Sequence, residues 1–298
     1  MTNILTIDLE DWHQLIRRRV SGDMSPASAA VGRQIDALLE LLERHQTQAT
    51  FFVLGMLAEA HPDFVKRIAA QGHEIASHGY AHVPTHRLSR QEFTDDCKRA
   101  KALLEDLTGQ PVRGYRAAEF SVRSQTLWVL EVLAELGFLY DSSIFPIRHR
   151  RYGIPGFAPR VAQYALRGGK QLFEVPLATV ALGPTTIPVA GGGYFRYMPN
   201  WLIRRAMGKL QAEQQPIVAY FHPYEFDSRP LDVFEDWHSS GWMHRLRGIR
   251  YNWHQNLGRH TMPGKLADLL SRHRFTSCLA YLQGAHPIER RALFSEVG

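Results

Sequence analysis

Residues 73–82 read HEIASHGYAH, and this stretch decides how the rest of the chain is interpreted. A short segment typical of a strand, 73–77, runs into a turn at Gly79, which has His78 on one side and His82 on the other. Neutral imidazoles are common ligands of zinc-like ions, and two of them four residues apart can reach one ion from a turn or a helical face. Because the chain contains 15 histidines, the spacing also fits two surface or helix-cap histidines, so the interpretation depends on the surrounding pattern.

Strand and helix patterns alternate on both sides of this stretch. Apolar runs typical of buried strands occur at 4–10, 49–54, 73–77, 112–116, 138–140, 172–180 and 217–221. Helical periodicity occurs between them, at 31–45, 62–70, 90–107, 124–136, 200–212 and 264–273. Such alternation predicts a parallel sheet whose strands end in loops at one edge. Since no Gly-x-Gly-x-x-Gly follows the first strand, we predict an α/β fold that is a barrel or a partly opened barrel rather than a doubly wound sheet.

Other regions lack this rhythm. Residues 144–169 are basic and contain three prolines, which favours a long surface insertion. The glycines at 191–193 have no helix start directly behind them and no Lys-Ser/Thr, so a phosphate loop is not expected. From 229 onward the chain is aromatic and basic with weak periodicity. We predict a main domain over 1–228 and a C-terminal extension over 229–298 that packs on the same domain.

The composition bounds the class of protein. With 45% hydrophobic and 21% charged residues, the 298-residue chain resembles a soluble globular protein. It has no apolar stretch near the roughly 18 residues that a membrane span needs. The two cysteines, Cys97 and Cys278, do not form a Cys-x-x-Cys or another ligand spacing, so a reducing cytoplasm is the expected compartment.

The charge pattern concerns possible partners. The formal charge is +6, and arginines cluster at 17–19, 148–151 and 245–250. Such clusters are either solvated faces or sites for an anionic polymer or lipid headgroup, so peripheral membrane association stays open. We expect no nucleic-acid partner, because no nucleic-acid module signature accompanies them.

Polar groups follow four of the predicted strands. Asp8-Leu9-Glu10-Asp11 ends the first strand, and the His78–His82 motif ends the third. Arg116 ends the fourth strand, and His222 ends a late strand. Parallel β/α topology brings these ends to one rim, where residues distant in sequence can meet around one ion.

The first of these strand ends supplies the carboxylates. Residues at i and i+2 of a strand point to the same side, so Asp8 and Glu10 face the site together. Two histidines and one carboxylate would leave open positions on a metal, as in a catalytic site. We assign Glu10 as the metal ligand and Asp8 as the general base, with Asp11 as the alternative ligand. The competing interpretation of this acidic cluster is a helix cap or a solvated turn.

The other two strand ends supply basic groups. A buried guanidinium at Arg116 needs an anionic partner, for which Asp8 is the candidate. His222 is placed to protonate a leaving amine, although a core histidine bonded to backbone is the alternative. The Asp141-Ser142-Ser143 segment is expected to cap the next element rather than to line the pocket.

Taken in order, these motifs resemble the NodB-homology polysaccharide deacetylases, carbohydrate esterase family 4. The resemblance covers about residues 4–226. This chain's form of the motifs, together with its C-terminal extension, resembles the subgroup that is encoded with bacterial exopolysaccharide export systems. The motifs that carry it are TIDLED at 6–11, HGYAH at 78–82, RAAEF at 116–120, YDSS at 140–143, GGGYFR at 191–196 and FHP at 221–223.

The resemblance implies a distorted (β/α) barrel, with 1–228 as the NodB-like catalytic domain, and metal-dependent removal of N-acetyl groups from amino sugars. It places the catalytic base on Asp8, the base-orienting arginine on Arg116 and the catalytic acid on His222. The family's histidine ligands fall on His78 and His82. The expected ion is Zn²⁺, with Co²⁺, Ni²⁺ or Mn²⁺ as alternatives.

Two departures from the family pattern concern the site. The family usually has two adjacent aspartates, the second of which binds metal, but Leu9 follows Asp8, so the ligand moves to Glu10 or Asp11. Ala118 stands where a proline is common. The expected substrate is a saccharide, with lipid-linked and anionic forms both open. The alternatives are a metal-dependent amidohydrolase acting on a small cyclic amide and a catalytically degenerate saccharide-binding protein.

Overall fold

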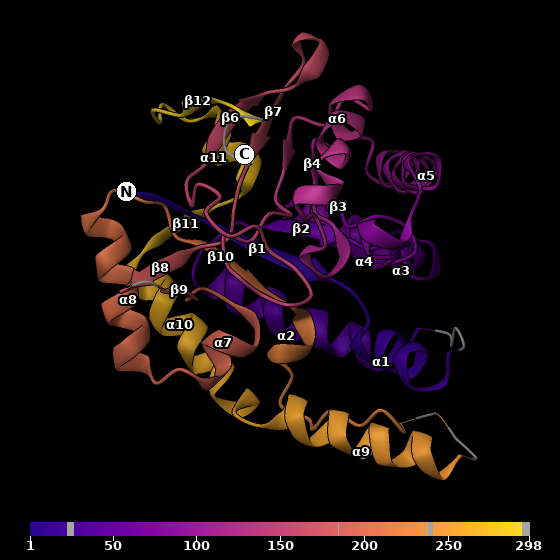
Figure 1. Cartoon of the computed structure of the whole chain (residues 1–298). Coiled ribbons are helices and arrows are strands. Elements are labelled where there is room, and N and C mark those ends of the chain that lie inside the picture. The colour runs from indigo at the N-terminus through magenta and orange to yellow at the C-terminus, as the bar shows by residue number, and fades with distance from the viewer. Residues whose placement is uncertain (23–26, 184, 236, 238–240, 294–298) are drawn as a thin grey trace.

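The computed structural model describes residues 1–22, 27–183, 185–235, 237 and 241–293, and it is built around a curved sheet (Figure 1). Strands lie side by side in the order β10-β1-β2-β3-β4-β5, and each neighbouring pair in this series is parallel. The bounds of these strands are β1 Thr2–Leu9, β2 Thr50–Val53, β3 Glu74–Ser77, β4 Gly114–Tyr115, β5 Tyr140–Asp141 and β10 Val218–Phe221.

Residues of β1 alternate between two cores. Ile7 and Leu9 belong to the large cluster that joins the sheet to the helices, whereas Ile4 belongs to a second cluster on the other face of the sheet. Alternate residues of a strand point to opposite faces. Thr6 and Asp8 therefore point to the inner face of the curved sheet, together with Ile4.

The sheet closes on itself through an irregular segment. β7 (Gln171–Glu174) pairs with β5, and the chain then crosses to β10, where the Ala178 N–H donates to the Val218 carbonyl at 3.2 Å. The Tyr220 N–H donates to the Ala190 carbonyl at 2.9 Å. Because isolated contacts replace a continuous ladder at this closure, the barrel is distorted. The predicted fold class is confirmed.

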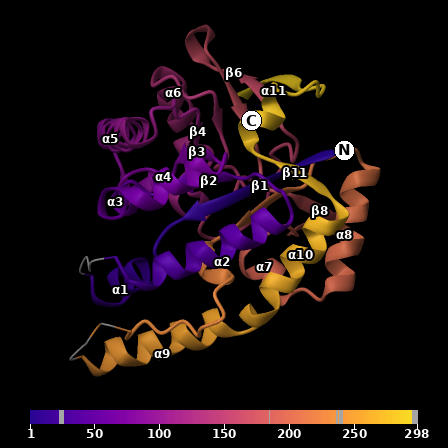
Figure 2. The same ribbon diagram turned by 180° about the vertical axis from the view of Figure 1, so that it is seen from behind.

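The helices follow the predicted rhythm and cover the outside of the sheet. α5 (Arg90–Thr108) begins at a capping box made by Ser89 and Glu92 and ends at Gly109, whose φ of +66° is left-handed. Seen from behind in Figure 2, α2 runs alongside β1, and α10 lies next to α2. The other bounds are α1 Trp12–Ser21, α2 Ala30–Arg44, α3 Gly55–Ala60, α4 Pro62–Ala70, α6 Trp128–Glu135, α7 Gly192–Tyr197, α8 Asn200–Ala212, α9 Trp242–Asn256, α10 Met262–Arg272 and α11 Cys278–Gln283.

Three sequence-based expectations are corrected. The predicted strand 172–180 is two strands, β7 and β8 (Thr179–Leu182), because Pro176 between them cannot donate to a ladder. The predicted insertion 144–169 contains β6 (Ala162–Ala165), which is antiparallel to β7.

The third correction concerns the glycine link. α7 begins directly at Gly192, although no helix start was expected there. A Cβ on Gly191 would lie 2.1 Å from the Tyr220 carbonyl oxygen. Glycine at this position therefore permits close approach to β10 and does not form a phosphate loop.

The C-terminal residues pack on the same body as the rest. β11 (Arg274–Thr276) pairs in parallel with the start of β1, and β12 (Glu289–Ala292) pairs in parallel with β6. β8 pairs with β9 (Thr185–Pro188) in a separate two-stranded sheet. The boundary at 228 stays a prediction.

Both cysteines are free and buried. Burial raises the pKa of the Cys278 thiol to about 12, so this side chain is an unreactive core group. Among the helices that the described residues form, none is long and apolar enough to cross a bilayer.

Candidate metal centre and active site

The histidines of the HGYAH motif lie beside the end of β1. His82 Nε2 lies 2.9 Å from Glu10 Oε2, and His78 Nε2 lies 3.7 Å from the same oxygen. Ligand atoms from these three residues all lie within 4.8 Å of one another. His78 Nδ1 lies 2.8 Å from the Arg116 carbonyl oxygen, so this nitrogen donates to the carbonyl and leaves Nε2 available. Two imidazoles and a carboxylate are the donor set of a catalytic zinc-type centre, and these residues fit such an ion.

Glu10 is ionised in this arrangement. Burial alone would raise the pKa of its carboxyl group, but the charge of His82 and hydrogen bonds with His78 and His82 hold the pKa well below its usual range. Glu10 is therefore deprotonated at neutral pH and can bind a cation without first losing a proton.

Asp11, the alternative ligand, is used elsewhere. Its Oδ1 accepts the His13 N–H at 2.9 Å, and its Oδ2 accepts the Ser28 N–H. The side chain is fully buried and caps the first turn of α1. Of the two carboxylates that the sequence leaves open, the structure brings only Glu10 to the histidines.

This difference predicts opposite effects of two substitutions. Asp11→Ala should lower the free energy of unfolding by about 1 to 3 kcal/mol, because two buried N–H groups lose their acceptor, while metal binding is retained. Glu10→Ala should weaken metal binding and leave the helix cap intact. Thermal unfolding and metal titration of both variants test this. Metal loss in Asp11→Ala with retention in Glu10→Ala would reverse the assignment.

The loop that carries the histidines is held by a residue that sequence reasoning missed. Asp96, on α5, accepts the Tyr80 N–H at 2.7 Å and the Ala81 N–H at 3.0 Å. A Cβ on Gly79, where φ is +72°, would lie 2.8 Å from Asp96 Oδ2. His82 itself has a φ of +52°, an uncommon conformation for a non-glycine residue. The Asp96 carboxylate thus fixes the loop that aims His82, and no spacing rule connects the two positions.

Asp8 and Arg116 form a buried pair behind the triad. Arg116 Nη1 donates to Asp8 Oδ1 at 2.7 Å and to Thr6 Oγ1 at 2.9 Å. The guanidinium is fully buried and lies 4.1 Å from the centre of the Phe52 ring. Arg116 is therefore paired with the carboxylate that the sequence nominated, which leaves Asp8 Oδ2 facing the site.

The Asp141-Ser142-Ser143 segment anchors Arg116 instead of capping an element. Arg116 Nε donates to the Ser142 carbonyl at 3.0 Å, and Nη2 donates to Ser142 Oγ at 2.7 Å. Ser143 Oγ accepts the Ala117 N–H at 2.7 Å and donates to Asp141. The expected cap is wrong, because the short β5 places these hydroxyls directly beside β4. Both Nε and Nη2 of Arg116 therefore have an acceptor on Ser142.

His222 lies across the site from the histidine motif. Its Nε2 lies 3.6 Å from Glu10 Oε1 and 4.0 Å from Asp8 Oδ2, and its Nδ1 lies 3.4 Å from Glu225 Oε2. The ring stacks on Tyr224 with a centroid distance of 4.9 Å. Burial alone would lower the pKa of His222, but the Glu225 hydrogen bond and the charges of Glu10, Glu225 and Asp8 raise it to about 9. The imidazole is therefore a proton donor at neutral pH.

Glu225 carries a role that sequence reasoning did not assign. The buried Oε2 of Glu225 also accepts the His222 backbone N–H at 2.9 Å, so one carboxylate orients both the backbone and the imidazole ring of His222. The signal was present in the sequence, because an acid three residues after a histidine and its proline is the pattern of a short capped turn.

We expect Glu225→Gln to shift the pH dependence of turnover. Gln keeps the size of the side chain and removes the negative charge, so the pKa of His222 falls. His222 is protonated below its pKa, and the alkaline limb of the rate profile should therefore move to lower pH by about one pH unit or more. Rate profiles of the wild type and the variant decide this. A loss of rate that is uniform across the pH range would show that Glu225 acts only on structure.

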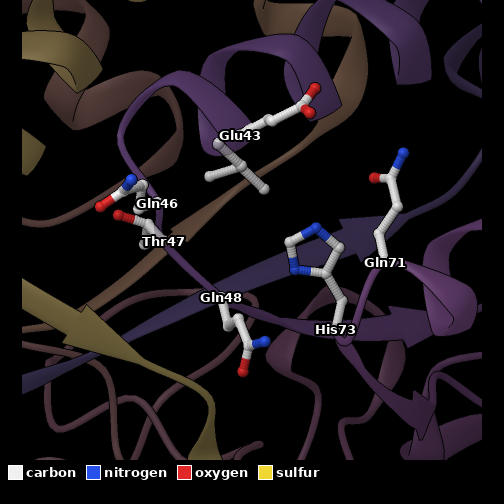
Figure 3. Close-up of a pocket in the computed structure, with 7 residues that line it drawn as sticks. Glu43, Gln46, Thr47, Gln48, Gln71 and His73 are labelled. Atoms are coloured by element: carbon white, nitrogen blue, oxygen red, sulfur yellow. The ribbon is translucent and has the colours of Figure 1, made fainter.

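A cavity of about 440 Å³ also lies at the opposite end of the strands (Figure 3). The ring of His73 lies in its middle, with Gln71 on one side and Gln46 and Thr47 on the other. His73 accepts the Ala49 N–H, and burial lowers its pKa to about 4. His73 is neutral at pH 7 and precedes β3, whereas His78 and His82 of the triad follow β3.

A larger basic pocket lies beside His82 of the triad. Its volume is about 530 Å³, and His82 forms part of its wall. Arg19 pairs with Glu119 across it, and Arg18 donates to the Ala81 carbonyl at 2.7 Å. Four arginines and one glutamate line this space, so its side chains carry a net positive charge. The lining residues are Leu15, Arg18, Arg19, Gly22, His82, Val83, Pro84, Arg87, Glu119, Arg151 and Tyr251.

Two family models match the chain. Residues 27–140 match the polysaccharide deacetylase model, and residues 142–283 match the model named domain of unknown function DUF3473. Fold and site define an α/β protein with a distorted barrel and a candidate metal centre at its strand ends. Over residues 27–140 the chain is therefore similar to polysaccharide deacetylases, and over residues 142–283 it is similar to the DUF3473 family.

Individual relatives agree with this family. The chain is 33% identical to a peptidoglycan-N-acetylglucosamine deacetylase of Bacillus cereus over 32% of its own length and 34% of that protein. It is 32% identical to a peptidoglycan deacetylase of Helicobacter pylori over 37% of its own length and 36% of that protein. The match thus spans about a third of these relatives. A solved structure, a putative polysaccharide deacetylase from Mycobacterium smegmatis, has the same fold, with a TM-score of 0.60 and 19% identity over 94% of this chain and 89% of that one.

Proposed function

We propose that the chain hydrolyses the acetamido group of an N-acetylated amino sugar in a saccharide. The observation that carries this proposal is the convergence of the Glu10-His78-His82 triad with Asp8 on one side and His222 on the other. A triad of this kind beside a base and an acid is what amide hydrolysis needs. The names of the relatives support a saccharide amide over the small cyclic amide.

The residues have separate tasks in this proposal. Glu10, His78 and His82 hold a divalent ion, which when bound supplies a polarised water and charge for the oxyanion. Asp8 Oδ2 takes the proton of the attacking water, while Arg116, which donates to Oδ1, holds the Asp8 carboxylate in place. His222 Nε2 gives its proton to the departing amine, and Glu225 on Nδ1 keeps it protonated until then.

The substrate that we favour carries negative charge and serves exopolysaccharide synthesis. The arginines of the pocket beside His82 support an anionic group next to the acetamido sugar, such as the diphosphate of a lipid-linked saccharide. We propose Zn²⁺ as the ion, because two imidazoles and a carboxylate are ligands that it prefers.

Acetate release from N-acetylglucosamine oligomers tests the function. The purified protein should release acetate when loaded with zinc, lose this activity in a chelator and regain it when zinc is returned. A diphosphate-linked N-acetylhexosamine should be the better substrate, and its advantage should shrink as salt is raised. A metal-loaded protein that releases no acetate from either substrate would refute the proposal.

A further inference from the structure

Helix α9 exposes an apolar stripe along its whole length. Trp242, Leu246, Ile249 and Trp253 recur at the i, i+4, i+7 and i+11 spacing that places residues on one helical face. Between 57% and 71% of each of these side chains is exposed. Soluble proteins rarely expose a continuous row of large apolar groups, so a row of this kind marks an interaction surface.

A neighbouring face of α9, about a quarter turn from the stripe, attaches the helix to the body. Gly248 packs against Val233 and Phe234, where a Cβ would lie 2.3 Å from the Phe234 ring. Asn252 Oδ1 accepts the Val233 N–H, and Asn256 Oδ1 accepts the Leu231 N–H, both at 2.8 Å. The helix is therefore oriented by its polar and glycine face, and the apolar stripe is directed outward.

The charge beside the stripe has one sign. Arg245, Arg247 and Arg250 are exposed on the same helix, and α9 contains no aspartate or glutamate. From Trp237 to Ala267 the sequence contains no acidic residue. An apolar row that has tryptophan near both ends and is flanked by arginines matches the interface of an anionic bilayer, which offers an apolar interior beneath negative headgroups.

We propose that α9 is a membrane-docking helix that lies in the headgroup region of an anionic lipid surface. Trp242, Leu246, Ile249 and Trp253 enter the acyl boundary, and the arginines contact the lipid phosphates. A second copy of this chain is a poorer occupant, because two α9 helices would bring like charges together without an acid on either helix.

The place of α9 relative to the active site agrees with this proposal. α9 packs along α1, and both lie at the same side of the molecule (Figures 1 and 2). Tyr251 of α9 and Arg18 and Arg19 of α1 line the basic pocket beside His82. A bilayer under α9 would therefore hold the pocket close to the headgroups. Docking itself rests on the helix alone and does not depend on the proposed deacetylase activity.

Vesicle sedimentation tests the proposal. The full chain should sediment with phosphatidylcholine vesicles that contain phosphatidylglycerol, and much less with pure phosphatidylcholine. A variant with serine at all four stripe positions should lose at least about tenfold in affinity, because the buried apolar area is removed. Arg245→Gln/Arg247→Gln/Arg250→Gln should lose about a hundredfold. Added salt should weaken wild-type binding.

Matched control variants distinguish docking through α9 from non-specific binding by other exposed apolar or basic side chains. Trp201→Ser/Leu182→Ser removes equally exposed apolar groups elsewhere and should bind vesicles like the wild type. Arg44→Gln/Arg113→Gln/Arg290→Gln removes the same charge from other exposed positions and should cost much less than the α9 change.

Several results would overturn the proposal. Failure of the wild type to bind anionic vesicles would do so, and so would binding that the stripe variant retains. A wild-type dimer that the stripe variant converts to a monomer would show that the stripe joins two copies. Acetate release by the stripe variant from a soluble oligomer should equal that of the wild type, so loss of docking and loss of catalysis are measured separately.

Discussion

Asp8→Asn should reduce acetate release by about 10²- to 10⁴-fold while the protein still binds metal. Glu10, and not Asp8, is the carboxylate that lies 2.9 Å from His82. The Asp8 oxygen that does not bind Arg116, Oδ2, faces His222 instead. Asn has the same shape but cannot take a proton from water. The fold should survive, because Arg116 keeps its bonds to Thr6 and Ser142.

The measurement compares kcat, metal content and thermal unfolding of the wild type and Asp8→Asn. A folded, metal-loaded variant without activity assigns proton transfer to Asp8. Retained activity would remove Asp8 from the base role. Loss of metal together with activity would instead make Asp8 a ligand or a group on which the ligands depend.

His78→Ala/His82→Ala should lower the affinity for zinc by at least about a hundredfold and abolish acetate release. Two of the three candidate ligands are then absent, and Glu10 alone cannot hold the ion. His86→Ala is the matched control, because it has the same spacing from His82 but is exposed and lies outside the triad. About one bound ion per chain in the wild type and in His86→Ala, and none in the double variant, is the expected outcome. Equal zinc binding by all three proteins would refute this centre.

The DUF3473 region takes part in the candidate site. The polysaccharide deacetylase match, 27–140, contains His78, His82 and Arg116, whereas His222 and Glu225 lie within the match 142–283. Asp8 and Glu10 precede both matches. The proposed base, Asp8, and the proposed acid, His222, therefore come together only when β1 pairs with β10. We expect neither the 27–140 region nor the 142–283 region to be active without the other.

The sequence by itself determined the rhythm of strands and helices and the strand ends at which polar groups gather. Apolar runs and helix caps act over a few residues, so α2, α4, α5 and α8 could be recognised locally. α9 could not, because its apolar residues face outward and its packing face is glycine and asparagine, which is the reverse of the usual amphipathic pattern.

Only the tertiary structure distinguishes the surroundings of the two carboxylates that follow Asp8, because it places Glu10 beside His82. Glu10 and Asp11 are adjacent and carry the same group, but Asp11 is claimed by the N–H groups of His13 and Ser28. Asp96 and Glu225 likewise acquired their tasks from neighbours brought close by folding or by a tight turn. The sequence specifies which functional group each residue carries. The fold decides which chain segments lie beside that residue and therefore which hydrogen-bond partners it has, and those partners decide its role.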